Sequence, residues 1–269
     1  PNPFVSHTLA MSFRDAFQKY IDHPERHDIV LFHDQNVIII KDMFPKSTRH
    51  LLVIPRNRQV TKNHPLDAFC TDYPEFTGHE LYNMVLGYVE KAKDLIIDEL
   101  FRYSNVNDKS QLLEFRNTCI KAGVHSIPSL NNLHVHVITQ DFHSPRMRNK
   151  KHYNSFTTKF FVPFEELNPE LNESYCRRTS QPFSETELSQ NSNSDCNSNT
   201  QYIVHERSTQ VMEKLIKTTP FKCTSCSKTF GNLMVKLKAH LHEEYTKKYA
   251  SFIVPNILIP NGVCAPCTK

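Results

Sequence analysis

The chain has 269 residues, 39% of them hydrophobic, and a formal net charge of +4 at pH 7. This composition supports a folded core and excludes a wholly disordered chain. No apolar run reaches the ~18 to 20 residues that span a bilayer, so we expect no membrane partner. The charge is uneven along the chain. From Arg207 onward there are ten Lys/Arg and three Glu, so this part carries +7 and the preceding part −3. A basic segment of this kind favours a polyanionic partner, although a solvated lysine-rich helix is an alternative.

The order of the predicted elements indicates an α+β fold with an antiparallel sheet and flanking helices. These elements are a helix over 12–21, strands over 29–33, 36–41 and 51–55, a helix over 81–100, and strands over 117–124 and 133–138. The helices show apolar residues at helical spacing, and the strands are short β-branched runs. The stretch 168–201 is instead dense in Ser, Asn, Thr and Glu, which is typical of a flexible linker.

These changes in composition divide the chain into five parts. We expect a leader over 1–11, a larger folded domain over 12–165, a linker over 166–206, a smaller basic domain over 207–254 and a tail over 255–269.

The strand from Leu133 to Ile138 reads Leu-His-Val-His-Val-Ile. Because side chains alternate along a strand, His134 and His136 share one face, and Leu133, Val135 and Val137 share the other. The apolar face suits a core and leaves two imidazoles side by side in a cleft. Two partly exposed strand histidines, or a metal site, are the alternatives, but no third ligand stands at a convincing local spacing.

Cys223, Cys226 and His240 have the spacing of a small zinc-binding finger. Glu244 follows His240 by four residues, so the two lie on one face of a helix, whereas His242 points elsewhere unless the helix breaks. We therefore favour Glu244 over His242 as the fourth ligand. Two C-x-x-C pairs without a secretory signal indicate reduced thiols and a nuclear protein, or one that is also cytoplasmic. The second pair, Cys264/Cys267, has no downstream ligands.

Several ordered motifs together resemble the histidine-triad nucleotide hydrolases and transferases, and within them the aprataxin branch, particularly its fungal members. The motifs are Asp42-Met-Phe-Pro-Lys46, His50-Leu-Leu-Val-Ile-Pro55, His125-Ser-Ile-Pro-Ser129, Leu133-His-Val-His136, Gln140-Asp-Phe142 and Asn149-Lys-Lys-His-Tyr-Asn-Ser-Phe156. The resemblance runs from about residue 12 to 162 and resumes at the finger. Asn132 stands where the triad has its first histidine, so the central, nucleophilic position falls on His134.

The resemblance implies hydrolysis of adenylated 5′ DNA ends left by abortive ligation, through a covalent histidine–AMP intermediate. It implies a catalytic set of His134, His136, His125, Ser129, Lys151 and His50, and a nucleotide-binding pair of Asp42 and Lys46. A stacking role for Phe13 also comes from the resemblance. Phosphate contacts are expected from Arg146, Arg148, Lys150, Lys236 and Lys238, because basic side chains favour the DNA backbone.

The expected cofactor is one structural Zn²⁺ held by Cys223, Cys226, His240 and Glu244, with no catalytic metal. The expected partners are double-stranded DNA with an adenylated 5′ end and AMP as product, and the protein is expected to be a monomer. Two other functions stay open at this point. One is a general histidine-triad hydrolase of small AMP conjugates, for which a basic finger has little use. The other is a non-enzymatic finger protein, which leaves the histidine pocket unexplained.

Overall fold

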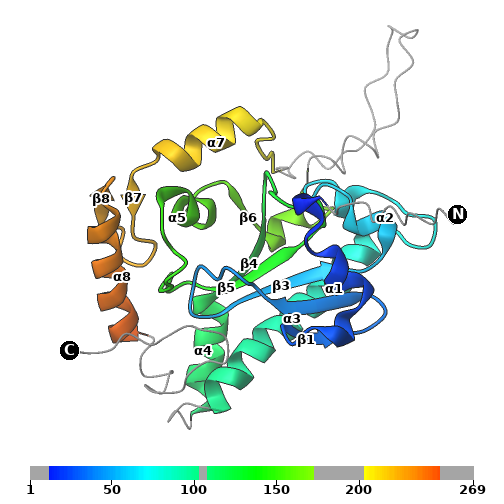
Figure 1. The fold of residues 1–269 in the computed structure, drawn as a ribbon, viewed down its shortest axis with the longest axis horizontal. Helices are drawn as coiled ribbons and strands as arrows, with labels where there is room; N and C mark the ends of the chain where they lie inside the picture. Colours follow the sequence, from blue (N-terminus) through cyan, green and yellow to red (C-terminus); the bar gives the residue numbers. More distant parts are fainter. Residues whose placement is uncertain (1–11, 103–107, 173–202, 249–269) are drawn as a thin grey trace, which may run out of the picture.

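The computed structural model (Figure 1) describes residues 12–102, 108–172 and 203–248. The expected leader (1–11), the expected tail (255–269) and the pair Cys264/Cys267 lie outside the described residues. Within the described ranges, no helix is both long enough and apolar enough to cross a bilayer.

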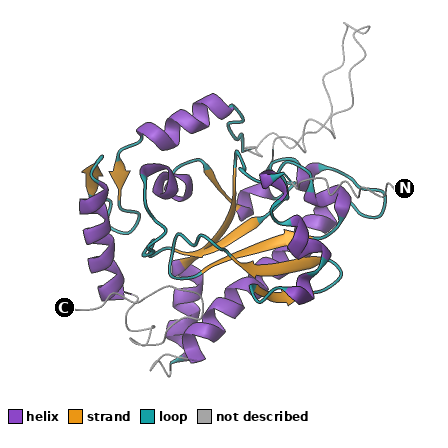
Figure 2. Cartoon of the chain, viewed as in Figure 1, coloured by secondary structure: helices purple, strands orange, loops and turns teal. Residues whose placement is uncertain are grey.

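A six-stranded antiparallel sheet, in the order β1-β2-β3-β5-β4-β6, forms the centre of the body, which we define as the described residues up to 172 (Figure 2). Its strands are β1 (Val30–His33), β2 (Val37–Lys41), β3 (His50–Pro55), β4 (Ile120–His125), β5 (Val135–Thr139) and β6 (Phe161–Pro163). The expected α+β architecture is confirmed, and β6 is the one strand of this sheet that the sequence did not predict. Because β5 pairs with β3 on one side and β4 on the other, the histidine strand lies in the interior of the sheet.

Helices flank this sheet. In chain order they are η1 (Phe13–Asp15), α1 (Gln18–Asp22), η2 (Pro24–Arg26), α2 (Arg58–Thr61), η3 (Ala68–Cys70), α3 (Gly78–Arg102), α4 (Lys109–Cys119), α5 (Lys150–Thr157) and η4 (Phe164–Leu167). The long helix expected over 81–100 is α3. The strand expected over 117–124 begins only at Ile120, because Asp108 caps a helix that runs through Cys119.

The single helix expected over 12–21 is two short helices in the structure. Ser12 caps the first of them by accepting a hydrogen bond from the backbone of Arg14. In a continuous helix the Arg14 carbonyl would accept from the backbone of Gln18, but here it accepts from Asn131, at 2.7 Å. A long-range contact therefore interrupts the helix, and it ties this segment to the loop that precedes β5.

The two faces of the sheet bury different partners. Val135 and Val137 of β5 pack with Val85 and Val89 of α3 in the largest apolar cluster. The opposite face of β2 and β3 packs against α1, in a cluster of Tyr20, Ile21, Ile38, Ile40, Leu52 and Ile54. The histidines of β5 lie on this second face.

A C-terminal module, residues 207–248, packs on the same side of the body as α5. It consists of α7 (Thr209–Thr218), β7 (Phe221–Lys222), β8 (Thr229–Gly231) and α8 (Met234–Lys248). Helix α7 lies alongside α5 (Figure 1). The Asn154 amide donates to the carbonyls of Ile216 and Thr219, at 3.1 and 2.9 Å, and the Tyr153 hydroxyl donates to that of Lys222, at 2.9 Å.

The body and the module also share an apolar cluster. It joins Phe142, Met147, Tyr153, Phe156 and Phe161 of the body to Phe221, Leu237 and Leu241 of the module. The two parts are therefore one packed unit and not two independent domains on a tether.

Residues at the two ends of the expected linker (166–206) are packed against the body. Leu167 is fully buried, and Asn172 forms an isolated parallel bridge with Ile203. The folded body thus extends beyond residue 165, because Leu167 supplies a core side chain just before the composition changes. Residues 173–202 lie outside the described part of the chain.

The shared cluster gives a test of this arrangement. Replacing Phe221, which is 1% exposed, by Ala should lower the free energy of unfolding by about 3 to 5 kcal/mol, since a large buried ring is lost. Val235 on α8 is 82% exposed, and its replacement by Ala should cost less than about 0.5 kcal/mol. Urea unfolding measures both. A two-step transition in the unmodified protein, with the module unfolding first, would contradict the single packed unit.

Candidate active site and metal centre

Strand β5 brings the two predicted histidines to one face of the sheet. Leu133, Val135 and Val137 are buried in the cluster with α3, as the alternation predicted. His134 and His136 lie on the other face, with their ring centroids 5.0 Å apart. The strand pairing places Leu52 of β3 and Gly123 of β4 on either side of His136. An added Cβ at Gly123 would come within 2.3 Å of the Val162 carbonyl, so β6 can approach β4 only at a glycine.

His50 and His136 form a hydrogen-bonded chain that begins at the loop carrying Asp42 and Lys46. His50 Nδ1 accepts from the Lys46 backbone N–H at 3.3 Å and lies 3.4 Å from Asp42 Oδ2. With Nδ1 as acceptor, His50 Nε2 carries the proton and donates to His136 Nδ1 at 2.9 Å. The remaining proton of His136 is then on Nε2, which is buried and has no hydrogen-bond partner among the described residues. An unpaired buried donor of this kind is suited to an oxygen of a bound ligand.

His134 is held in the tautomer that a nucleophile needs. Its Nδ1 lies 2.7 Å from the carbonyl oxygen of Asn132, which can only accept, so Nδ1 carries the proton. The lone pair is then on Nε2. The ring of Phe17 on the N-terminal segment meets this imidazole edge-on, at 5.2 Å between centroids. Asn132 itself is buried, and its amide donates to the Thr61 hydroxyl at 3.1 Å.

Phe156 of α5 contacts three of the imidazoles. Its ring centroid lies 4.7 Å from that of His125, 5.1 Å from that of His136 and 5.4 Å from that of His50. The Nε2 atom of His125 is buried without a hydrogen-bond partner among the described residues. The sequence motif contained Phe156, but nothing in the pattern indicated that it packs over the histidines.

Burial keeps these imidazoles neutral. It lowers the pKa of His50 from 6.5 to about 4, and it lowers the pKa values of His125 and His136 well below 6.5. Burial also lowers the pKa of His134. All four rings are therefore uncharged at neutral pH, and the lone pair of His134 is available. The pKa of Lys46 is lowered by burial too.

Three other residues that the sequence assigned to this site have different surroundings. Ser129 is exposed in the loop before β5. Lys151 is exposed at the start of α5, and its Nζ lies 3.7 Å from a carboxylate oxygen of Glu213 on α7. The ammonium of Lys46 bonds to the carbonyl of Phe44 on the same loop.

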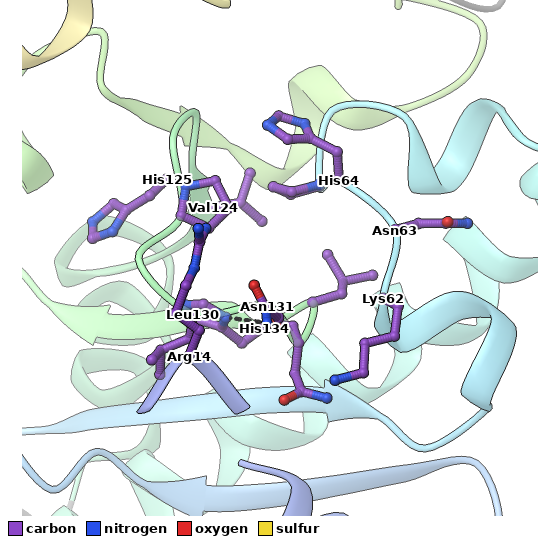
Figure 3. A pocket seen from close by; sticks show the side chains of 13 residues that line it. Arg14, Lys62, Asn63, His64, Val124, His125, Leu130, Asn131 and His134 are labelled. Carbon is purple, nitrogen blue, oxygen red and sulfur yellow. Dashed lines mark hydrogen bonds between the residues drawn. The ribbon is translucent and has the colours of Figure 1, made fainter. Parts of the chain in front are cut away.

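A cavity of about 160 Å³ adjoins His134 (Figure 3). Its lining includes His125, His134, Asn131 and, on opposite sides of the view, Arg14 and Lys62. The sequence did not indicate these two cations. They come from segments far apart in the chain, and no local pattern marks either of them.

The aromatic and basic residues expected to contact DNA differ in their surroundings. Phe13 is 81% exposed, and Lys236 and Lys238 are exposed on α8. Arg148 is exposed as well, whereas Arg146 lies over the ring of Phe44, at 5.5 Å from its centroid. Lys150 is not directed outward in the same way, because its Nζ donates to Asn232 and to the carbonyl of Thr218, at 3.2 Å.

Three of the four expected zinc ligands come together in the module. Ligand atoms of Cys223, Cys226 and His240 lie within 4.8 Å of one another, with 3.2 Å between Cys226 Sγ and His240 Nε2. Zn–S and Zn–N bonds of ordinary length span about 3.5 Å between two ligands of a tetrahedron, so these residues fit a zinc ion. The module is a small zinc-binding finger.

The two candidates for the fourth zinc ligand have different partners in the structure. His242 Nδ1 lies 3.1 Å from His143 Nε2 of the body, so this ring faces away from the cysteines. Glu244 lies one helical turn after His240, and its carboxylate is 3.2 Å from Lys248 Nζ. It is not part of the three-residue cluster, and its ion pair with Lys248 is partly exposed, with 49% of the Lys248 side chain and 17% of the Glu244 side chain accessible.

Asp42, His50 and His136 form a second group with metal-ligating atoms within 4.8 Å of one another. Their ring nitrogens face each other: His50 Nε2 bonds to His136 Nδ1, and His50 Nδ1 faces the loop. The nitrogens are therefore engaged along a chain and do not converge on one point. This arrangement favours a hydrogen-bond relay over an ion-binding site.

Two family models match the chain. The model described as "Scavenger mRNA decapping enzyme C-term binding" matches residues 14–152, and the model described as "C2HE / C2H2 / C2HC zinc-binding finger" matches residues 157–247. An aprataxin-like protein of Saccharomyces cerevisiae is 32% identical over 258 residues, which cover 89% of this chain and 99% of that protein. An aprataxin-like protein of Schizosaccharomyces pombe is 34% identical over 237 residues, covering 87% and 82%.

Solved structures agree with these matches. A crystal structure of the aprataxin ortholog Hnt3 in complex with DNA is 33% identical, with a TM-score of 0.64 over 88% of this chain and 96% of that chain. A structure of Hnt3 in complex with DNA and guanosine is 32% identical, with a TM-score of 0.63 over 90% and 100%.

The buried imidazoles predict how stability depends on pH. Because the folded state lowers the pKa of His50 from 6.5 to about 4, the unfolded state binds more protons within this window. The free energy of unfolding should therefore be highest above pH 6.5 and fall as the pH is lowered toward 4, by on the order of 3 kcal/mol for His50 alone. Urea unfolding between pH 7 and 4.5 should show a shallower slope for His50→Gln than for the unmodified protein. An unchanged slope would count against this origin, and His23→Gln, at an exposed site, is the control.

Loss of zinc should lower the stability of α5 in the body. Cys226→Ser should release the metal and loosen β7 and α8, and with β7 the Lys222 carbonyl that accepts from Tyr153 of α5. Hydrogen exchange of the α5 amides should then accelerate, while that of the β2 and β3 amides stays slow. Unchanged protection of α5 in a zinc-free variant would show that the module does not support it.

Proposed function

The chain belongs to the aprataxin family of histidine-triad proteins that carry a C-terminal zinc-binding finger, and on this premise we propose that it removes AMP from adenylated 5′ DNA ends. Such ends are left when a ligation stops after the adenylate has been transferred. The observation that carries this proposal is the neutral His134, with Nδ1–H bound to the Asn132 carbonyl and the Nε2 lone pair free to attack.

The reaction proceeds in two displacements at the α-phosphorus of AMP. His134 Nε2 forms a bond to this phosphorus while the bond to the bridging oxygen breaks, and the DNA 5′ phosphate leaves with the electron pair. The product is an AMP–histidine phosphoramidate. Water then attacks the same phosphorus, the P–N bond breaks, and AMP is released with His134 neutral again.

The neighbouring residues bind different parts of the substrate. Asp42 accepts hydrogen bonds from the ribose hydroxyls, and Lys46 shapes this part of the pocket. His136 Nε2–H donates to a phosphate oxygen and is held in that tautomer by His50, because the chain of ring nitrogens fixes both protons. Ser129 contributes a further hydroxyl from the loop before β5.

His125 and Lys151 are assigned to the leaving phosphate. The buried, unpaired Nε2 of His125 supports this role, because a phosphate oxygen would supply its missing partner. Lys151 starts α5 next to Lys150 and keeps an exposed ion pair with Glu213, which is weak enough to exchange for a phosphate.

DNA is held by contacts that do not read sequence. Phe13 presents an exposed ring that can stack on a terminal base pair, and Lys236 and Lys238 extend from α8 toward solvent. Arg146 and Arg148 are further basic side chains for phosphate contacts. Lys150 is bonded to Asn232 of the finger, so its first role is to join the body to the finger. Affinity should therefore fall steeply with salt.

We assign one structural zinc ion to the finger, with Cys223, Cys226, His240 and Glu244 as ligands. Glu244 is favoured because His242 is bonded to His143 of the body. The ion supplies folding stability and no chemistry at the phosphate. Two thiolates balance its charge, so the lysines of α8 stay available for DNA.

A nicked duplex with a 5′-AMP cap tests the function. His134→Ala should abolish AMP release, because no other group can form the covalent intermediate, while His23→Ala at an exposed site should leave it unchanged. A brief EDTA treatment that leaves the finger folded should not stop the first step, since the scheme needs no catalytic metal. Full activity of His134→Ala would overturn the assignment. Equal rates on capped DNA and on small AMP conjugates would instead indicate a general nucleotide hydrolase.

A further inference from the structure

Helix α7 of the C-terminal module lies beside α5, and the proposed reaction gives it no role (Figure 1). Its buried residues Met212 and Ile216 pack with Phe160 of the body, and Ile127 of the loop that follows His125 packs against the same cluster. Near the end of α7, two side chains of α5 donate hydrogen bonds to its carbonyls. The backbone of α7 is therefore held at a fixed position beside both α5 and this loop.

Glu213 of α7 bridges two lysines, one on each helix. Its Oε2 lies 2.6 Å from Nζ of Lys217, one turn later on α7, and 3.7 Å from Nζ of Lys151 at the start of α5. The hydrogen bond from Lys217, together with the charge of Lys151, lowers the pKa of Glu213, so its carboxylate is ionised at neutral pH. All three side chains are about half exposed, so each ion pair is weak and can exchange with a ligand from solution.

A phosphate that binds Lys151 has to compete with the Glu213 carboxylate. Loss of Lys151 costs Glu213 little, because the carboxylate keeps its closer partner Lys217. A 5′ phosphate monoester carries close to two negative charges at pH 7 and so attracts Lys151 more strongly than a carboxylate with one charge. A phosphodiester within the strand carries a single charge and has no such advantage. The pair therefore favours a terminal phosphate over the rest of the DNA backbone.

We propose that Glu213 is a positioning residue that competes with the leaving 5′ phosphate for Lys151 and thereby promotes release of the repaired DNA end. The inference rests on the proposed function, which assigns Lys151 to that phosphate. While the anhydride is intact, the phosphate on the DNA side carries one charge, and Glu213 competes with it on equal terms. When the P–O bond breaks, this phosphate takes the electron pair, so its attraction for Lys151 is strongest as the bond breaks. Glu213 stays within reach and recovers Lys151 as the DNA dissociates.

Binding of the product measures this competition directly. Two nicked duplexes, one with a 5′ phosphate at the nick and one with a 5′ hydroxyl, would be titrated with the full chain and followed by fluorescence anisotropy. Glu213→Gln should tighten binding of the 5′-phosphate nick by about two- to fivefold, because an exposed ion pair that opposes binding is lost. It should leave the affinity for the 5′-hydroxyl nick unchanged. In steady-state assays of AMP release, the same variant should lower KM for the capped nick without raising kcat.

Three further variants separate this competition from general electrostatics and from folding. In a Lys151→Met background, Glu213→Gln should change neither affinity, because Glu213 acts through Lys151. Glu243→Gln removes the same charge from an exposed position on α8 and should shift both affinities by one common factor. Lys217→Met removes the closer partner of Glu213 and should weaken binding of the 5′-phosphate nick more than that of the 5′-hydroxyl nick. A packing defect in α7 would weaken binding, so a gain in affinity is not a sign of misfolding.

The possible outcomes separate the two proposals. If the unmodified enzyme releases no AMP from a capped nick, the proposed function fails, and the role of Lys151 at a leaving phosphate fails with it. If the enzyme is active but Glu213→Gln leaves the affinity for the 5′-phosphate nick unchanged, or shifts both affinities alike, the competition alone is refuted. A gain that persists in the Lys151→Met background would also refute it, since a group other than Lys151 would then carry the effect.

Discussion

The active site depends on the two-residue period of one interior strand. In β5 that period places Leu133, Val135 and Val137 in the core over α3 and directs His134 and His136 to the opposite face. A shift of one residue in the pairing with β3 and β4 would exchange the two sets, so the apolar side strongly fixes the register. The imidazoles on the other face are enclosed by Phe17, Phe156 and their own neighbours. Burial keeps them neutral because it disfavours the charged imidazolium, and a neutral ring is the form that can attack phosphorus.

The hydrogen bonds that this burial requires also determine what each ring does. A buried imidazole must place its single proton where an acceptor lies, and the available acceptors differ. For His134 the acceptor is the Asn132 carbonyl, which leaves the lone pair on Nε2. For His136 the relay through His50 leaves a donor instead. In the proposed reaction, two histidines of one strand thus serve as nucleophile and phosphate donor because their hydrogen-bond partners differ.

Asn132 explains why the triad tolerates a change at its first position. The backbone carbonyl of this residue orients His134, and any residue type supplies that atom. Its side chain bonds to Thr61 and so anchors the start of β5 to α2. The finger acts on the site in a comparable, indirect way, since it clamps α5 through Tyr153 and Asn154, and α5 carries Phe156 and Lys151. Under the proposed function, the module that attaches DNA is therefore also the one that supports the catalytic centre.

The sequence by itself determined the α+β class, the histidine strand with its two faces, and three ligands of the zinc finger. Each of these is encoded by a short-range period or spacing, which the chain carries wherever it folds. Tertiary structure alone decided the break in the N-terminal helix, where Asn131 takes the carbonyl that Gln18 would have used, and the joining of Arg14, Lys62 and His134 around one cavity. It also decided the shared core of body and finger and the tautomers of the imidazoles. These features are contacts between residues that are distant in sequence, so no local pattern can contain them.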